Sequence, residues 1–181
     1  MPDQTIPPLP TDQPTLAEVW VEHTAQEFIH RDVEATLRTM TDTPQVIAVA
    51  LATGGRGREA VRDYYARHFI GRTPQDTRIE LLSRTVGGER VVDEMILSFT
   101  HDIETPWILP GIAPTGRHVE IPIVAIVTFQ DGKIHDEHLY WDQASVLAQT
   151  GLITATSLTA LGIDQAKVLR GPTTPLNIPP G

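Results

Sequence analysis

Several kinds of residue are absent or scarce in this sequence, and each absence excludes a class of site. There is no cysteine, which excludes disulfide bonds, thiolate metal sites and a cysteine nucleophile. Basic residues are few: 14 Lys and Arg against 23 Asp and Glu give a net charge of −9, which disfavours nucleic acid and anionic membranes as partners. No stretch approaches the ~20 apolar residues of a membrane-spanning helix, and the N-terminus lacks the basic and apolar regions of a secretory signal. We therefore expect a cytoplasmic protein with no membrane partner.

Proline is concentrated at the two ends of the chain. Five prolines fall within the first 14 residues and four within the last 11, where they oppose regular secondary structure. A chain of 181 residues fits one domain with tails. We predict a proline-rich arm over residues 1–14, one domain over 15–153, and an extension over 154–181 that is proline-rich at its end. The two ends are either disordered or drape over a dimer partner.

Three helices are predicted in the first half of the chain. Thr15 and Glu18 form a capping-box pattern before a run of apolar residues at helical spacing, which ends near residue 30. An aspartate cap starts a second helix over 32–40, and a glycine-rich turn leads into a third over 59–70. Pro44 is expected to break the pattern before a short buried strand over 46–51.

The second half reads as two hairpins and a short helix. Strands over 77–86 and 90–101 meet at Gly87-Gly88, and strands over 119–129 and 133–141 meet at Asp131-Gly132, a strong hairpin signal. A short helix follows, and a further one could form within 155–169. This order predicts an α+β domain in which a curved sheet wraps a helical layer around an interior pocket.

The stretch from Pro114 to Leu152 carries a series of motifs in a fixed order. These are TGR, an apolar strand, DGKI, an acidic strand, YWD and a helix ending in QTGL. The series resembles the closing signature of the SnoaL-like polyketide cyclases, part of the nuclear-transport-factor-2-like (NTF2-like) superfamily, and the likeness covers roughly Leu16 to Ile153. It implies an NTF2-like cone with three N-terminal helices packed on a strongly curved, mainly antiparallel sheet. It does not name a substrate, because this fold carries many unrelated functions.

The strand over 133–141 is polar for a core strand. Strict alternation places Asp136, His138, Tyr140 and Asp142 on one side, which we predict to face the pocket. In SnoaL-like cyclases an aspartate just before the last helix acts as general acid/base, and Asp142 is the residue that matches. The competing interpretation is that Asp142 caps the following helix.

Three further residues are candidates for catalysis. His138 and His101 could orient Asp142 or bind a developing enolate oxygen, although either could be structural. Glu94 lies inside an apolar strand, so it is either on the solvent face or buried with a partner. The motif HDEH does not predict a metal site, because His135 and His138 would point to opposite faces of a strand. We expect no metal and no cofactor.

Aromatic and histidine side chains supply the expected walls of the pocket. The loop over 104–115 is too apolar for a solvated loop and is predicted to form a flap over the cavity mouth or a dimer contact. The residues predicted to bind substrate are Trp20, His23, Tyr64, Phe69, Trp107 and Tyr140.

Three functions remain open at this point. The first is a cofactor-independent acid/base enzyme, a cyclase, isomerase or related lyase acting on a small apolar or aromatic carbonyl compound. The second is a hydrolase of the same fold that activates water with Asp142 or Glu94. The third is a non-catalytic ligand-binding protein. A homodimer is also predicted, because the strand over 119–129 is apolar on both faces and the face without helices needs a cover.

Overall fold

The computed structural model describes residues 14–154 and 162–170. The predictions for the proline-rich ends and for residues 155–161 lie outside these ranges. No helix within them is long and apolar enough to cross a membrane.

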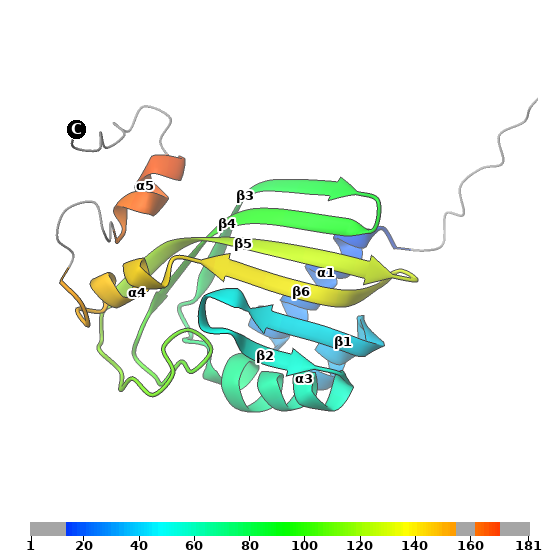
Figure 1. Cartoon of the computed structure of the whole chain (residues 1–181), viewed down its shortest axis with the longest axis horizontal. Helices are drawn as coiled ribbons and strands as arrows, with labels where there is room; N and C mark the ends of the chain where they lie inside the picture. The colour runs from blue at the N-terminus through cyan, green and yellow to red at the C-terminus, as the bar shows by residue number, and fades with distance from the viewer. Residues whose placement is uncertain (1–13, 155–161, 171–181) are drawn as a thin grey trace, which may run out of the picture.

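One curved sheet organises the domain (Figure 1). Its strands lie in the order β2-β1-β6-β5-β4-β3, and all neighbours are antiparallel except the parallel pair β1 and β6. The strands are β1 (Met40–Ala48), β2 (Thr53–Arg56), β3 (Arg78–Gly87), β4 (Arg90–Thr100), β5 (His118–Gln130) and β6 (Lys133–Trp141).

Helices from the first half of the chain cover one face of this sheet, which we call the inner face. In Figure 1, α1 lies behind the strands and α3 packs beside β1 and β2. The helical segments are α1 (Leu16–Ala25) with the π-helical turn η1 (Gln26–His30), α2 (Val33–Arg38), the 3-10 turn η2 (Val49–Leu51), and α3 (Arg58–Tyr64) followed by η3 (Tyr65–Phe69) and η4 (Ile70–Arg72). The predicted α+β cone is therefore confirmed.

Local sequence signals fix the ends of several elements. Thr15 and Glu18 form the predicted capping box at the start of α1. Asp131 and Gly132 both have positive φ, as a primed two-residue hairpin turn requires. Pro44, in contrast, lies inside β1 rather than before it. It sits where the pairing of β1 with β6 is interrupted, between Met40 and Gln45, so its missing N–H removes no regular ladder bond.

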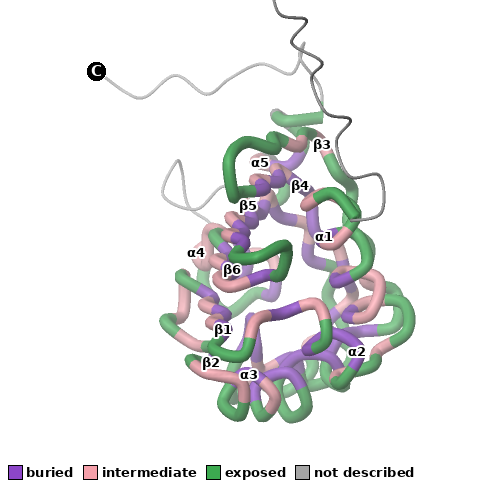
Figure 2. The backbone as a smooth tube through the Cα atoms, turned by 90° about the vertical axis from the view of Figure 1, so that its right-hand side faces the viewer, coloured by how far each residue is buried: buried purple, intermediate pink, exposed green. Residues whose placement is uncertain are grey.

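The inner faces of the central strands and the helices enclose the core (Figure 2). Alternate residues of β5 are buried from Val119 to Phe129, while those between them are half-exposed. The half-exposed residues form the outer face of the sheet, which carries no helix from the N-terminal half.

Two short helices follow the sheet. The helix α4 (Gln143–Gln149) comes directly after β6, and α5 (Asp164–Arg170) lies near the start of β5 (Figure 1). Arg170 of α5 forms ion pairs with Glu80 of β3 at 2.6 Å and Glu120 of β5 at 2.5 Å. Both glutamates belong to the outer face, so α5 covers one end of that face.

Candidate functional site

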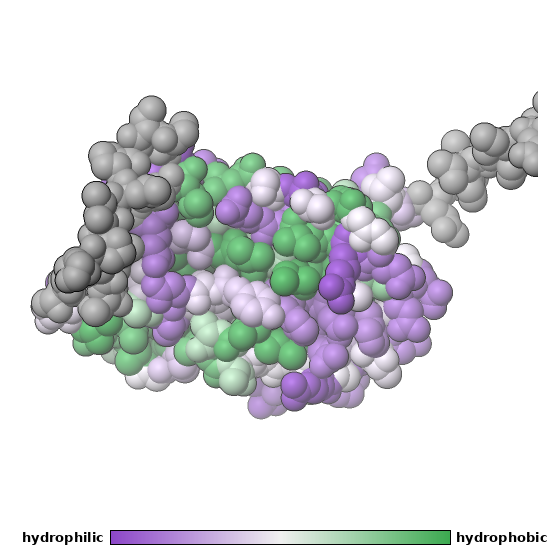
Figure 3. All heavy atoms as spheres, turned by 45° about the horizontal axis from the view of Figure 1, so that its top comes forward, coloured by the Kyte–Doolittle hydropathy of each residue, from purple (hydrophilic) through white to green (hydrophobic). Residues whose placement is uncertain are grey.

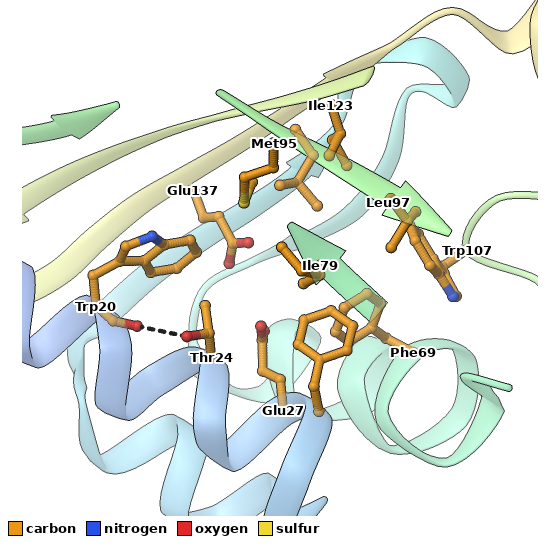
Figure 4. A pocket seen from close by; sticks show the side chains of 12 residues that line it. Trp20, Thr24, Glu27, Phe69, Ile79, Met95, Leu97, Trp107, Ile123 and Glu137 are labelled. Atoms are coloured by element: carbon orange, nitrogen blue, oxygen red, sulfur yellow. Dashed lines mark hydrogen bonds between the residues drawn. The ribbon is translucent and has the colours of Figure 1, made fainter. Parts of the chain in front are cut away.

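A small apolar cavity lies between α1 and the inner face of the sheet (Figure 4). Its volume is about 30 Å³, and its apolar wall includes Trp20, Phe28, Phe69, Met95, Leu97 and Trp107. Two carboxylates, from Glu27 and Glu137, point into this apolar space toward each other. Apolar walls with a few polar groups aimed inward are a feature of small-molecule sites, but this cavity is much smaller than the ~300–1,000 Å³ of most of them.

Four polar side chains meet beside the cavity, and we call them the buried cluster: His23, Glu27, Tyr65 and Glu137. Each is at most 2% exposed. The Nε2 atom of His23 lies 3.2 Å from Glu27 Oε1, 3.2 Å from the Tyr65 hydroxyl oxygen and 3.6 Å from Glu137 Oε2. The Tyr65 hydroxyl in turn donates to Glu137 Oε2 at 3.0 Å.

The hydrogen-bond partners of His23 assign its protonation. The Thr39 hydroxyl donates to the carbonyl of Thr36, so at 2.7 Å from His23 Nδ1 it acts as an acceptor, and Nδ1 carries a proton. The hydroxyl proton of Tyr65 is directed to Glu137, so Nε2 also faces only acceptors. We therefore assign His23 as a doubly protonated imidazolium.

The charges agree with this assignment. Burial opposes a charge on His23, but Glu27 and Glu137 outweigh burial and raise the pKa of His23 to about 10. Burial raises the pKa of Glu27 and the Glu137 charge adds to this effect, while the His23 cation opposes it. Burial and the two carboxylates raise the pKa of Tyr65 well above its ordinary value, so the phenol stays a neutral donor. Burial thus disfavours the charged form of Glu27, and the neighbouring His23 cation favours it.

Two helices change their winding where they supply this cluster. Glu27 lies in the π-helical turn that continues α1, and Tyr65 begins the π-helical turn that continues α3. Such turns occur often at functional sites, because the wider winding redirects side chains. His23 and Glu27 are four residues apart, on one face of the helix.

A second buried ion pair supports the wall of the cavity. Arg84 binds Asp93 through two hydrogen bonds of 2.7 Å, and Asp93 is 1% exposed. Asp93 also accepts a 2.8 Å hydrogen bond from Trp20 Nε1. The Trp20 ring stacks on His23, with centroids 5.4 Å apart. Arg84 and Asp93 therefore hold the indole that covers the imidazolium.

Several predicted wall residues are found at the cavity. Trp20, Phe69 and Trp107 line it, with the rings of Phe69 and Trp107 in edge-to-face contact at 5.1 Å. His23 belongs to the buried cluster, and Tyr64 is buried behind Phe69, 6.3 Å between ring centroids. The loop over 104–115 reaches the cavity through Trp107.

The polar face of β6 that was predicted to line the pocket points away from the cavity. Asp136, His138 and Tyr140 do share one face, but it is the outer face, where Tyr140 is 42% exposed and His138 pairs across from Ile126. Placing His138, Tyr140 and Asp142 at the cavity was therefore wrong. Pairing with β5 is irregular between Thr128 and Phe129, opposite Asp136 and Ile134. This irregularity shifts the alternation, so Glu137 rather than its neighbours faces inward with Leu139.

Asp142 lies at the N-cap of α4 and is not among the residues that line the cavity. Its Oδ1 accepts from the Ala144 N–H at 2.9 Å, and its Oδ2 accepts from Ser145 Oγ at 3.0 Å and from Gln165 Nε2 at 2.7 Å. Burial opposes the charge, yet these hydrogen bonds outweigh it and lower the pKa of Asp142. A lowered pKa suits a permanent anion better than a group that exchanges protons near neutral pH.

Glu94 and His101 are also placed away from the cavity lining. Glu94 lies on the outer face of β4 and accepts a 3.3 Å hydrogen bond from Ser83, so the solvent-face interpretation holds. His101 is buried at the end of β4, where the Thr115 N–H donates to its Nδ1 at 3.3 Å. Burial lowers the pKa of His101. Its contact with Thr115 joins the end of β4 to the end of the loop over 104–115.

The buried cluster also has the composition of a metal site. One donor atom each from His23, Glu27 and Glu137 lies within 4.8 Å of the other two. A divalent ion there would have to replace the Nε2 proton of His23. This set was not predicted from the sequence, in which HDEH was the motif weighed for metal binding.

The fold agrees with a match to a family model. The family model of the SnoaL-like domain matches residues 21–137, well over half of the chain. The chain belongs to the SnoaL-like domain family. Its N-terminal boundary in this match lies within α1, and the match ends at Glu137 of the buried cluster.

Solved structures show the same fold at low sequence identity. A protein named as a SnoaL-like polyketide cyclase from Jannaschia sp. CCS1 has a TM-score of 0.61 and 20% identity, covering 80% of this chain and 99% of that one. A protein with a ketosteroid isomerase-like fold from Catenulispora acidiphila DSM 44928, in complex with trimethylamine, has a TM-score of 0.58 and 17% identity, covering 76% and 95%.

A third structure is that of the epoxide hydrolase/cyclase-like enzyme SalBIII, named for pyran ring formation in the polyether salinomycin. It has a TM-score of 0.54 and 21% identity, covering 70% of this chain and 90% of that one. No curated protein matches the sequence. At these identities the structures establish the shared fold alone.

Substitution of Asp142 separates its two interpretations. Asp142→Ala removes the cap and should lower the free energy of unfolding by about 1 kcal/mol. Asp142→Asn keeps an acceptor for the Ala144 N–H and should cost less. Thermal melts of both variants, with turnover on a ketone panel, make the comparison. A fall in turnover with Asp142→Asn at unchanged stability would show that Asp142 acts in catalysis after all.

Proposed function

We propose that this protein is a cofactor-independent acid/base enzyme that acts on an enolisable carbonyl compound, as a cyclase or isomerase. The single observation that carries the proposal is Glu27: a carboxyl group that lines an apolar cavity, has its pKa raised by burial, and lies 3.2 Å from an imidazolium. A carboxyl group whose pKa is raised by burial can both take and return a proton.

The other members of the buried cluster have supporting roles in this mechanism. Glu27 removes a proton from the carbon next to the substrate carbonyl, and the enolate that forms carries a negative charge. The His23 cation lies close to that charge and stabilises it. Tyr65 and Glu137 hold His23 in place through the hydrogen bond from the phenol to the carboxylate. Return of the proton from Glu27 to carbon completes an isomerisation. In a cyclisation, the enolate carbon bonds to a second carbonyl carbon, and Glu27 gives its proton to the alkoxide oxygen that forms.

A second candidate is a hydrolase of the same fold. The size of the cavity favours this candidate over a non-catalytic ligand-binding protein. A space of about 30 Å³ between two carboxylates is roughly that of one water molecule, which Glu27 or Glu137 could activate against an epoxide. Similarity to the epoxide hydrolase/cyclase-like structure is consistent with this candidate. The two candidates differ in what they consume: one needs an acidic C–H, the other a strained C–O bond.

Removing the acidity of Glu27 tests the proposal. Glu27→Gln keeps the size of the side chain but cannot transfer a proton, so the exchange of ketone α-protons with D₂O should fall by about 10²–10⁴-fold. Proton NMR of methyl ketones and β-keto esters gives the rate. Glu22→Gln is the matched control, because Glu22 is an exposed carboxylate of α1 that precedes Glu27. An unchanged exchange rate in Glu27→Gln would contradict the proposal, and epoxide opening without ketone exchange would favour the hydrolase.

We further propose that two copies associate through the part of the outer face that α5 leaves open. Val92, Val124 and Ile126 lie there, side by side on β4 and β5 and half-exposed. Figure 3 shows hydrophobic side chains gathered on this side of the molecule. A solvated face of an antiparallel sheet is normally polar, so an apolar one favours a cover.

An arginine in this surface should separate the copies. We expect light scattering to give twice the 19.9 kDa mass of one chain for the wild type and a single-chain mass for Val124→Arg. The control is Val21→Arg on α1, where Val21 is 51% exposed on the opposite side of the sheet. A wild-type protein that stays at the single-chain mass at micromolar concentration would refute the dimer.

A further inference from the structure

A second and larger hollow adjoins the small cavity. It is a groove of about 380 Å³ between α1 with η1 on one side and β3 on the other. Its rim is apolar and exposed: Val21 is 51% exposed, Ile29 74%, Ile79 37% and Leu81 48%. The groove exists because the inner face of β3, the edge strand, extends beyond the cover of the helices.

The groove and the cavity adjoin each other. Both are lined by Thr24, Phe28, Ile79 and Met95, so these four side chains lie at the boundary between them. Figure 4 shows Ile79 and Met95 beside Glu27 and Glu137. The cavity of about 30 Å³ has room for one small group, whereas small-molecule sites usually measure about 300–1,000 Å³. A substrate that reaches Glu27 therefore has to leave most of its body in the groove.

A pair of charged side chains marks the groove wall. Arg84 lines it, with Nε and Nη2 bound to Asp93. Its Nη1 has no hydrogen-bond partner among residues 14–154 and 162–170. Arg84 and Asp93 are the charged residues that line the groove, and their charges cancel. This N–H donor therefore suits a neutral acceptor, a carbonyl or hydroxyl oxygen, better than a carboxylate, which Asp93 would repel.

We propose that the groove is the second half of the substrate site and selects an elongated, apolar molecule with a carbonyl or hydroxyl oxygen placed to reach Arg84. The inference rests on the proposed function for the position of the reacting carbonyl at Glu27. Arg84 is a specificity-determining residue here rather than a catalytic one, because it reaches the buried cluster only through Asp93 and Trp20.

Chain length provides the first test. Methyl ketones from 2-hexanone to 2-undecanone are titrated into the full chain, and binding is followed by tryptophan fluorescence, since Trp20 and Trp107 line the cavity. Affinity should rise about twofold to fourfold per methylene as the chain fills the groove. Leu81→Gln should reduce the affinity for 2-undecanone but not for 2-hexanone. Val86→Gln is the matched control, because Val86 is 51% exposed on the same strand but does not line the groove.

A second oxygen provides the test of Arg84. Among diones of eight to twelve carbons, at least one spacing should bind about fivefold to tenfold more tightly than the monoketone of equal length, the usual worth of one net hydrogen bond. The double variant Arg84→Met with Asp93→Asn should abolish that advantage. The change Asp93→Asn avoids a buried unpaired carboxylate and keeps an acceptor for the Trp20 indole N–H, so the double variant should fold, and monoketone affinity should be unchanged.

Binding without turnover keeps this test separate from that of the proposed function. If Glu27→Gln exchanges ketone protons at the wild-type rate while the length and oxygen effects hold, the acid/base proposal fails and the groove stands. If affinity does not depend on chain length, the groove does not bind the substrate chain. Equal losses of 2-undecanone affinity in Leu81→Gln and Val86→Gln would contradict the proposal in the same way. No gain from any dione spacing would overturn the role of Arg84.

Discussion

The structure depends on one electrostatic constraint: two carboxylates, Glu27 and Glu137, are buried at the centre of the domain and need a cation. An unpaired buried carboxylate costs several kcal/mol, and removing one partner of such a pair costs about 3–5 kcal/mol. His23 is that cation. It is fully buried between them and hydrogen-bonded on its other side through Thr39 to the backbone of Thr36. The cluster is therefore part of the framework of the fold as well as a chemical site.

The cone shape is what brings these groups together. His23 and Glu27 come from α1 and η1, Tyr65 from η3, and Glu137 from β6, the strand on which the parallel and antiparallel parts of the sheet meet. Arg84 and Asp93, from β3 and β4, reach the same point through Trp20. A rigid network of this kind preorganises charge, which is what stabilising an enolate requires. The open groove beside β3 is the complementary part, because the packed core leaves little room for a substrate.

The fold could be predicted from the sequence to a large extent, because its signals are local. Capping residues at Thr15 and Asp32, the positive-φ turn at Asp131-Gly132 and the alternation of β5 each act over a few residues. The strand β1 was predicted too short, because Pro44 was taken as a break although it lies in an irregular part of the ladder.

The site was harder to predict, and β6 shows why. Counting in steps of two from Ile134 puts His138 and Tyr140 inside, but the irregular pairing with β5 reverses the phase and puts Glu137 there. Alternation alone cannot reveal such a shift, which depends on the neighbouring strand. The burial of Asp93 could have been predicted, because Asp93 alternates in phase with Val91 and Met95 in β4. The burial of Glu27 could also have been predicted, because it lies one turn after His23 on a buried helix face.

The protonation state of His23 tests most directly whether this residue is the buried cation between Glu27 and Glu137. Side-chain ¹⁵N NMR against pH should show both ring nitrogens protonated at neutral pH, with a pKa near the value of about 10 that the two carboxylates impose. Because this pKa is raised above the ordinary 6.5, the imidazolium stabilises the fold fully below pH 6.5. That stability should be lost as the pH rises toward about 10, by at most about 1.4 kcal/mol per pH unit. A His23 ring that is neutral at pH 7.5 in the folded protein would contradict the account.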